Sequence, residues 1–169
     1  GSGAFQSLTT GTQNTAVGME AGSTQQAAAN CTFLGYRAGK DSTGEANTFV
    51  GSLCGDATDD GASNTAVGQS ALSANCGDSN VAVGVNALLV CTNNNNTAVG
   101  ALAGNNITGG TQNTLIGAQV EAEAAGSNNC IGLGFNIVAG AGFTTLGIDS
   151  SDIRAAHGNV TWATVSDQR

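Results

Sequence analysis

Residues Asn64-Thr65-Ala66-Val67-Gly68 decide the fold, because this short motif recurs along almost the whole chain. It returns unchanged at residues 14–18 and 96–100, and looser copies begin at Cys31, Asn47, Asn80, Asn113, Asn128 and Phe143. The motif glycines stand at positions 18, 35, 51, 68, 84, 100, 117, 132 and 147. The chain is therefore an internal repeat with a period of about 16 residues.

A unit of this length is too short for a pair of helices and fits one coil of two short strands and two turns. The β-branched Thr and Val residues, punctuated by glycines, favour strands over helices. The sequence predicts an all-β, parallel β-solenoid of about nine coils over residues 4–147. Residues 1–3 have the composition of an expression-tag remnant, and residues 148–169 are expected to form a polar connector.

The alternation of side chains along a strand predicts which residues line the coil. The valine position of the motif holds only Val, Leu or Ile, and we expect it to face the interior together with the threonine two residues earlier. It comprises Val17, Leu34, Val50, Val67, Val83, Val99, Ile116, Ile131 and Leu146. The alanine position varies in bulk from Ala16 to Phe33 but carries no charge, so we expect it to face outward against another copy of the chain.

An asparagine opens most copies of the motif. Side-chain amides that stack along parallel strands hydrogen-bond to one another. We therefore expect a structural ladder made of Asn14, Asn47, Asn64, Asn80, Asn96, Asn113 and Asn128.

Charge and composition exclude several classes of partner. Only 9% of the residues are charged, the net charge is −8, and no Lys or Arg lies between Lys40 and Arg154. Phosphate neutralisation needs clustered cations, so we expect neither nucleic-acid binding nor attraction to anionic membranes. No apolar run approaches ~18 residues, and we expect no membrane insertion. The five cysteines form no Cys-x-x-Cys pair, so they are expected to be mostly reduced and to pack as small hydrophobes, although a disulfide between chains stays open.

The repeat resembles the head repeats of trimeric autotransporter adhesins, whose Asn-Ser-Val-Ala-Ile-Gly motif is similar to Asn-Thr-Ala-Val-Gly. Similar arrays occur in phage tail fibres and in surface proteins of large algal viruses. The resemblance implies a left-handed parallel β-roll, three of which pack side by side as a homotrimer. The unit found here is slightly longer than the common coil of that family, which leaves handedness and side-by-side packing open.

The last four residues, Ser166-Asp167-Gln168-Arg169, resemble the Ser-Asp-x-Arg opening of the intramolecular chaperone of the endosialidase type. In that family the chaperone drives trimerisation and then cuts itself off just before the serine. The resemblance implies that residues 148–169 connect the array to a chaperone domain. The candidate junction consists of Val165, Ser166, Asp167 and Arg169.

These observations predict a structural and host-attachment segment of a homotrimeric viral fibre or spike, located extracellularly on the virion surface. Its expected partners are further copies of the chain and a host receptor, expected to be a carbohydrate. The alternatives are a bacterial trimeric adhesin head, an ice-binding solenoid and a glycan depolymerase. The ice-binding alternative calls for a flat Thr-x-Thr face, whereas the residue two after Thr is Val here.

Catalysis needs convergent groups with matched pKa values, and few are present. His157, the only histidine, lies near Asp149, Ser150, Ser151 and Asp152, a region that we interpret as connector. Glu121 and Glu123 are two carboxylates, as in the active site of a glycosidase. Their spacing on one strand is poor evidence for such a site. We expect no enzyme activity and no cofactor.

Two further motifs have plain structural interpretations. Asp56, Asp59 and Asp60, before Gly61, lack the spacing of known calcium loops, so we expect a solvated turn and no metal. The pair Gly132 and Gly134 lacks the strand–helix context of a dinucleotide site.

Receptor contacts are expected from exposed aromatics or from longer loops. The aromatic candidates are Tyr36 and Trp162, and the loops span residues 23–30 and 118–127. Glycosylation sequons start at Asn30, Asn95, Asn106 and Asn159, in a chain where such motifs are common by chance.

Overall fold

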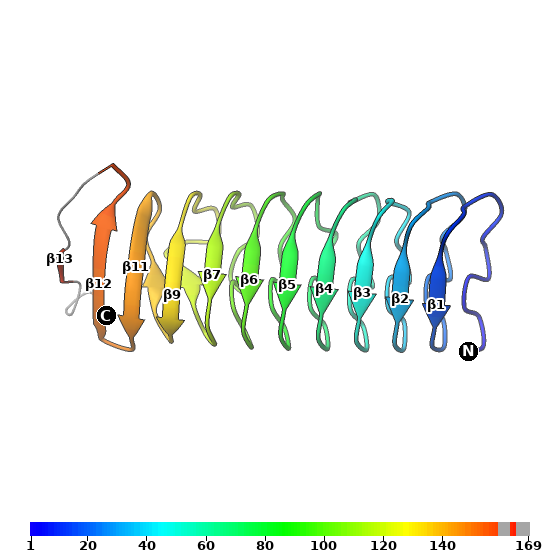
Figure 1. Cartoon of the computed structure of the whole chain (residues 1–169), viewed down its shortest axis with the longest axis horizontal. Coiled ribbons are helices and arrows are strands. Elements are labelled where there is room, and N and C mark those ends of the chain that lie inside the picture. The colour runs from blue at the N-terminus through cyan, green and yellow to red at the C-terminus, as the bar shows by residue number, and fades with distance from the viewer. Residues whose placement is uncertain (159–162, 165–169) are drawn as a thin grey trace.

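The computed structural model describes residues 1–158 and 163–164, and it confirms an all-β parallel solenoid with coils of about 16 residues. Strands that follow one another along the chain lie side by side along one elongated body (Figure 1). The described residues contain no helix. The parallel strands of the main sheet are β1 (Thr15–Val17), β2 (Thr32–Leu34), β3 (Thr48–Val50), β4 (Thr65–Val67), β5 (Val81–Val83), β6 (Thr97–Val99), β7 (Thr114–Ile116), β9 (Ile131–Phe135) and β11 (Phe143–Ile148).

The remaining strands lie at the C-terminal end of the array. On the far side of the coils, β8 (Glu121–Ala122) and β10 (Val138–Ala139) form a second, parallel pair. After β11 the chain reverses, and β12 (Ser151–Ala156) and β13 (Ala163–Thr164) continue the main sheet with antiparallel pairing. Eight complete coils therefore precede the hairpin, and residues 151–156 of the expected connector are a strand.

The predicted orientation of the motif is wrong. The alanine position faces the interior, where Phe33 and Phe49 have no exposed surface. The valine position faces outward, with Val17 54%, Leu34 46% and Val67 39% exposed. All residues predicted to line the coil through this position lie partly or fully exposed: Val17, Leu34, Val50, Val67, Val83, Val99, Ile116, Ile131 and Leu146.

Variation in bulk inside a narrow coil is possible because two interior positions compensate each other. Phe49 is followed six residues later by Gly55, where a Cβ atom would lie 2.5 Å from Cδ2 of the Phe49 ring. Ala66 is followed at the same spacing by Leu72, which fills the space that the small residue leaves. The same exchange holds in neighbouring coils for Phe33 with Gly39 and for Ala82 with Leu88. These four coils thus reach dense packing with one large side chain at one of these two positions, whereas the coils of Ala16 with Gly22 and of Ala98 with Gly104 have a small residue at both.

The copy of the motif that begins at Asn128 is displaced by two residues from its predicted register. Ile131 pairs with Thr114 and not with Ile116. Gly134, with φ of 155°, takes the place of the motif glycine that was predicted at Gly132. A shift of two residues leaves each side chain on the same face of the strand. The alternation of inward and outward residues therefore does not reveal this register error. Leu133 therefore replaces Ile131 in the valine row.

The motif glycine is needed where the strand leaves the sheet. Gly68 has φ of 138°, a region that other residues rarely adopt. A Cβ atom there would also lie 2.6 Å from the carbonyl carbon of Gly84 in the next coil. The close stacking of coils at this corner therefore excludes a side chain.

The asparagine ladder is confirmed for six of its seven members. The side-chain Oδ1 of Asn64 accepts from the backbone N–H of Asn80 (2.8 Å), and Oδ1 of Asn80 accepts from the N–H of Asn96 (2.9 Å). Nδ2 of Asn80 donates to the carbonyl oxygen of Asn93 (2.8 Å). The ladder bonds to the backbone of the following coil come from Asn14, Asn47, Asn64, Asn80, Asn96 and Asn113.

Asn128 is the exception, because of the displaced register. It lies at the exposed edge, where its Oδ1 accepts from the N–H of Thr111 (2.7 Å). Cys130 occupies the ladder position and donates its own N–H to Oδ1 of Asn113 (2.9 Å).

The five cysteines are buried free thiols, in agreement with the reduced state expected for them. Burial raises the pKa of Cys54 to about 12 and those of Cys76 and Cys130 to about 11. Cys54 lies among the small interior residues Ala38 and Ala71 of the neighbouring coils, which occupy the equivalent position.

The ladder should be sensitive to a single buried amide. Asn80→Ala leaves the N–H of Asn96 without its partner inside the coil, and we expect the free energy of unfolding to fall by about 2 kcal/mol or more. Asn94→Ala is the control, because Oδ1 of Asn94 accepts an N–H in the same way from Asp78 but at an exposed site. Water can replace that bond, so the control should change by less than about 1 kcal/mol in urea denaturation. Equal losses in the two variants would contradict a special role for the buried ladder.

The compensation between interior positions predicts a rescue. Phe49→Ala creates a cavity and Gly55→Leu forces a clash with the Phe49 ring, so each variant should lose about 3 kcal/mol or more of stability. The double variant reproduces the Ala66 and Leu72 pair of the next coil, and Leu72 already has the same backbone conformation, with φ of 55° against 59° at Gly55. We expect the double variant to be more stable than either single variant in a double-mutant cycle. Additive losses would refute the compensation.

The buried thiols predict alkaline destabilisation. Because the folded-state pKa of Cys54 is raised above that of the unfolded thiol, near ~8.5, the unfolded state loses its proton first. The stabilisation is present below about pH 8.5 and declines as the pH rises from there toward the folded-state value. Cys54→Ala should lose less stability than the wild type between pH 8 and pH 10.5 in urea titrations. If the free energy of unfolding fell equally with pH in both proteins, Cys54 would not be a cause of the alkaline destabilisation.

Candidate functional surfaces

The outer side of strands β1–β7 and β9 is a flat surface of two rows, here called the strand face. The threonine row pairs Thr15, Thr32, Thr48, Thr65, Val81, Thr97, Thr114 and Ile131 in register from coil to coil. The valine row runs beside it, two residues further along each strand. Neither row contains a charged residue in any coil. The strand face is therefore a continuous, uncharged and largely aliphatic surface along the array.

The threonines of the strand face have unused hydroxyl groups. Within the described part of the chain, the hydroxyl groups of Thr15, Thr32, Thr48, Thr65, Thr97 and Thr114 make no hydrogen bond. Corner threonines differ, since Thr24 and Thr92 donate their hydroxyls to the carbonyl oxygens of Lys40 (2.7 Å) and Thr108 (2.9 Å). The fold does not need a hydroxyl on the strand face, because Val81 and Ile131 occupy the same row.

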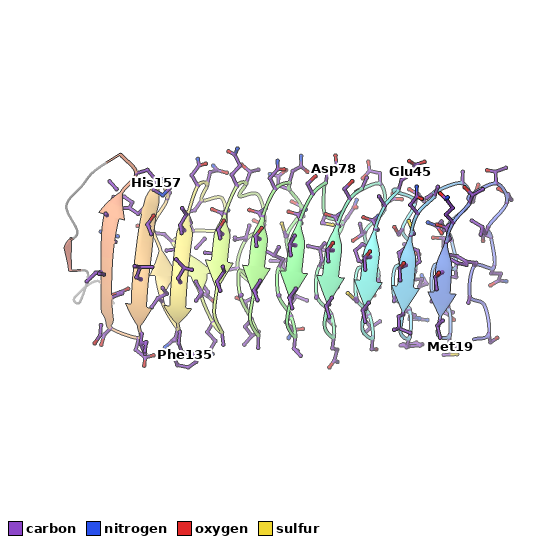
Figure 2. All side chains as sticks on the ribbon, in the orientation of Figure 1. Met19, Glu45, Asp78, Phe135 and His157 are labelled. Atoms are coloured by element: carbon purple, nitrogen blue, oxygen red, sulfur yellow. The ribbon has the colours of Figure 1, made fainter. Side chains whose placement is uncertain are left out.

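Around the motif glycine lies a third row, here called the corner row, which varies from coil to coil. It consists of Met19, Tyr36, Ser52, Gln69, Val85, Ala101, Ala118 and Phe135. Met19 and Phe135 lie along one long edge of the array, whereas Glu45, Asp78 and His157 lie along the opposite edge (Figure 2). The edge with the corner row therefore mixes apolar and polar side chains, and the opposite edge carries the acidic residues Glu45 and Asp78.

The acidic turn of coil three is solvent-facing, as expected. Asp59 and Asp60 are exposed, and Asp59 donates its N–H to Oδ1 of Asn75 (2.9 Å). Burial, followed by the charge of Asp41, raises the pKa of Asp56. Among the residues that the structure describes, no three His, Cys, Asp or Glu side chains come together to hold a metal ion.

The structure separates the residues near His157. Asp149 lies at the turn before β12 and accepts a hydrogen bond from Nδ2 of Asn136 (2.6 Å), while Asp152 is buried within the strand. His157 follows the other end of β12, where its N–H donates to the carbonyl oxygen of Gly142 (2.8 Å). A six-residue strand is about 20 Å long, so these groups do not form a triad.

The other candidates fall in different places. Glu121 is half-buried in β8 and Glu123 is exposed beyond it. The sequon residues Asn30 and Asn95 are exposed, whereas Nδ2 of Asn106 is bound to the carbonyl oxygen of Ala122 (2.7 Å). Several candidates lie outside the described residues: Asn159, Trp162, Val165, Ser166, Asp167 and Arg169.

Sequence reasoning missed the strand face and the corner row. It placed the valine row inside, so the uncharged outer surface was assigned to the wrong side of the strand. The sequence did contain a signal for the correct orientation. A large Phe49 goes with a small Gly55, and a small Ala66 goes with a large Leu72, which indicates that both positions face the same interior.

Comparisons with known proteins give no functional assignment, so the proposed function depends on the surfaces described above. No family model, no curated protein and no solved structure matches the chain. The part of the chain that the structure describes also has no helix long and apolar enough to cross a membrane.

Proposed function

We propose that the chain is a structural and host-attachment segment of a homotrimeric viral fibre or spike. The observation that carries this proposal is the strand face, which is uncharged and partly apolar over all eight coils. A surface of this kind on a protein with net charge −8 is typical of an interface. The cover is a second and a third copy of the same chain, bound through the strand face.

Identical copies suit the strand face because they share its period. When copies stack side by side and in parallel, each coil meets the coil of the same number, so every valine contact repeats along the axis. The number three comes from the resemblance of the motif to trimeric adhesin heads and to viral fibres. The Ser-Asp-x-Arg end favours the viral setting, on the virion surface, over a bacterial adhesin head.

In this role the segment acts mechanically and by adhesion. The coils extend the fibre, and three copies present equivalent surfaces to a receptor, which raises avidity without any new contact. We propose a carbohydrate receptor, and neither catalysis nor a cofactor. Release of reducing ends from a host polysaccharide would contradict this and favour a depolymerase.

One observation favours a second candidate, an ice-binding solenoid. Six threonine hydroxyls of the strand face point outward, have no hydrogen-bond partner among the described residues and repeat at about the 4.8 Å spacing of parallel strands. A flat lattice of hydroxyl and methyl groups can order water. Thermal hysteresis of a monomeric sample would select this candidate, and its absence would exclude it.

The fibre proposal predicts the solution mass. Light scattering should give three times 16.5 kDa, and Val67→Lys with Val99→Lys should give a monomer, because the added charges would be buried between copies. The control is Ala57→Lys with Gln26→Lys, which adds the same charge at exposed sites away from the strand face. The control should remain trimeric. A wild-type monomer, or a trimer that survives the strand-face lysines, would contradict the proposed interface.

A further inference from the structure

Coil two departs from the rest of the array in its chemistry. Tyr36 is the only tyrosine of the chain, and Arg37 and Lys40 are two of its four basic residues. Most other coils hold small, aliphatic or amide residues at the equivalent positions, such as Ser52-Leu53, Gln69-Ser70 and Ala101-Leu102, and Phe135 is the other aromatic residue of the corner row. In a repeat protein the other coils show what the fold requires, and it does not require an aromatic or a cation here.

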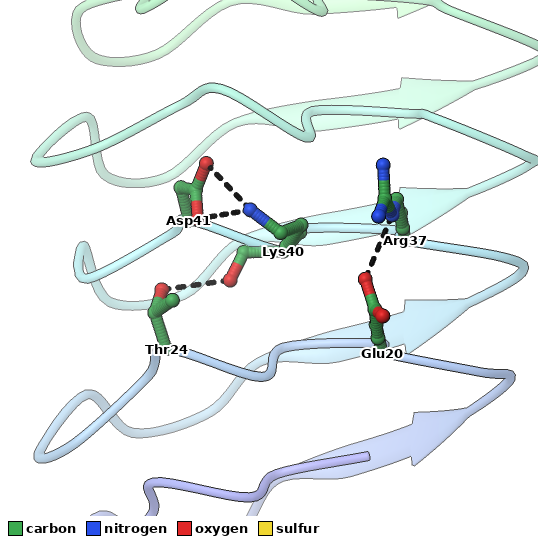
Figure 3. Close-up of polar contacts among 5 residues, drawn as sticks. All are labelled: Glu20, Thr24, Arg37, Lys40 and Asp41. Atoms are coloured by element: carbon green, nitrogen blue, oxygen red, sulfur yellow. Dashed lines mark hydrogen bonds and ion pairs between the residues drawn. The ribbon is translucent and has the colours of Figure 1, made fainter. Parts of the chain in front are cut away.

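The side chains of Tyr36, Arg37 and Glu20 form one cluster, and Lys40 and Asp41 form a separate ion pair further along the coil. The guanidinium carbon of Arg37 lies 5.2 Å from the centroid of the Tyr36 ring. Nε of Arg37 donates to Oε2 of Glu20 in the preceding coil (2.7 Å), and Nζ of Lys40 pairs with Oδ1 of Asp41 (3.0 Å) (Figure 3). The backbone of coil one places Glu20 directly across from Arg37, since the N–H of Arg37 donates to the carbonyl oxygen of Met19.

The cluster remains open to solvent. The Tyr36 residue is 39% exposed, and the side chains of Arg37 and Glu20 are 39% and 34% exposed. Arg37 uses Nε for Glu20, and its two terminal nitrogens make no hydrogen bond within the described residues. The carboxylate of Glu20 retains acceptor capacity. An aromatic surface, free donors and free acceptors therefore lie together at one point of the array.

We propose that Tyr36, Arg37 and Glu20 form a binding site for a neutral saccharide. The C–H face of a sugar ring packs on the exposed part of the Tyr36 ring, and its hydroxyls accept from Arg37 and donate to Glu20. This inference rests on the proposed attachment to host glycans and specifies where the glycan binds. The corner row lies beside the strand face, so the site stays at the rim when copies associate.

Charge favours a neutral ligand over an anionic one. Each cation of coil two already has a carboxylate partner, Glu20 for Arg37 and Asp41 for Lys40. The whole chain carries a net charge of −8 and repels anions. A sialylated or sulfated sugar would meet no unpaired positive charge in this cluster.

The test is a glycan array probed with the full chain. The probes are neutral oligosaccharides of glucose, galactose, mannose, fucose and N-acetylglucosamine, together with sialylated and sulfated sets. We expect saturable binding to at least one neutral probe. Tyr36→Ser with Arg37→Leu installs the Ser52-Leu53 pair of the next coil, so it should fold and lower the affinity by about tenfold or more.

The matched control installs the same two residues in coil four, two coils beyond the site. Gln69→Ser with Ser70→Leu should leave saccharide binding unchanged. Equal affinity in the coil-two variant and the wild type, binding of anionic probes alone, or no saccharide binding would each overturn the site. The fibre proposal fails separately: a trimer without saccharide binding overturns only this site, whereas a monomer that binds through Tyr36 overturns only the homotrimer.

Discussion

The constraint on which the structure depends is the small cross-section of the coil. An interior bounded by about 16 residues of backbone has room for few large side chains, so most buried positions hold Ala, Gly, Cys or a small polar residue beside single larger ones such as Phe49 or Ile107. The glycine-rich composition and the reciprocal pairs such as Phe49 with Gly55 follow from it. So does the asparagine ladder, because a coil with so little apolar area gains from satisfying its buried backbone N–H groups through side-chain amides.

The properties that depend on spacing were predictable from the sequence. The period, the strand assignment and six rungs of the ladder follow from the recurrence of one motif. Orientation was not predictable in the same way, because both sides of each strand are uncharged and an alternating pattern does not say which side is inside. The predicted register was wrong in the copy that begins at Asn128, where Gly134 and not Gly132 has the backbone conformation of the motif.

The candidate surfaces were predictable in part. Tyr36 was recognised as an exposed aromatic, but its neighbours were not, because Glu20 reaches Arg37 only after one coil stacks on the next. Residues about 16 positions apart become neighbours when coils stack. A cluster can therefore be built from two repeats and cannot be recognised in the sequence of either repeat alone. The threonine and valine rows of the strand face are nearly the same in every coil. Coil two differs from the others in its aromatic and charged side chains.

The regular stacking also bears on how the chain folds. Ladder bonds such as the one between Asn64 and Asn80 join residues 16 positions apart. Each parallel strand of the main sheet pairs with the strands of the adjacent coils. Relative to the length of the chain, this separation corresponds to a contact order of about 0.1, a value typical of helical bundles and low for a sheet protein. Folding can nucleate in any pair of adjacent coils and spread by one coil at a time. An all-β chain of this design should therefore reach its folded form at the rates of helical domains, before its exposed strand edges can pair with those of other chains.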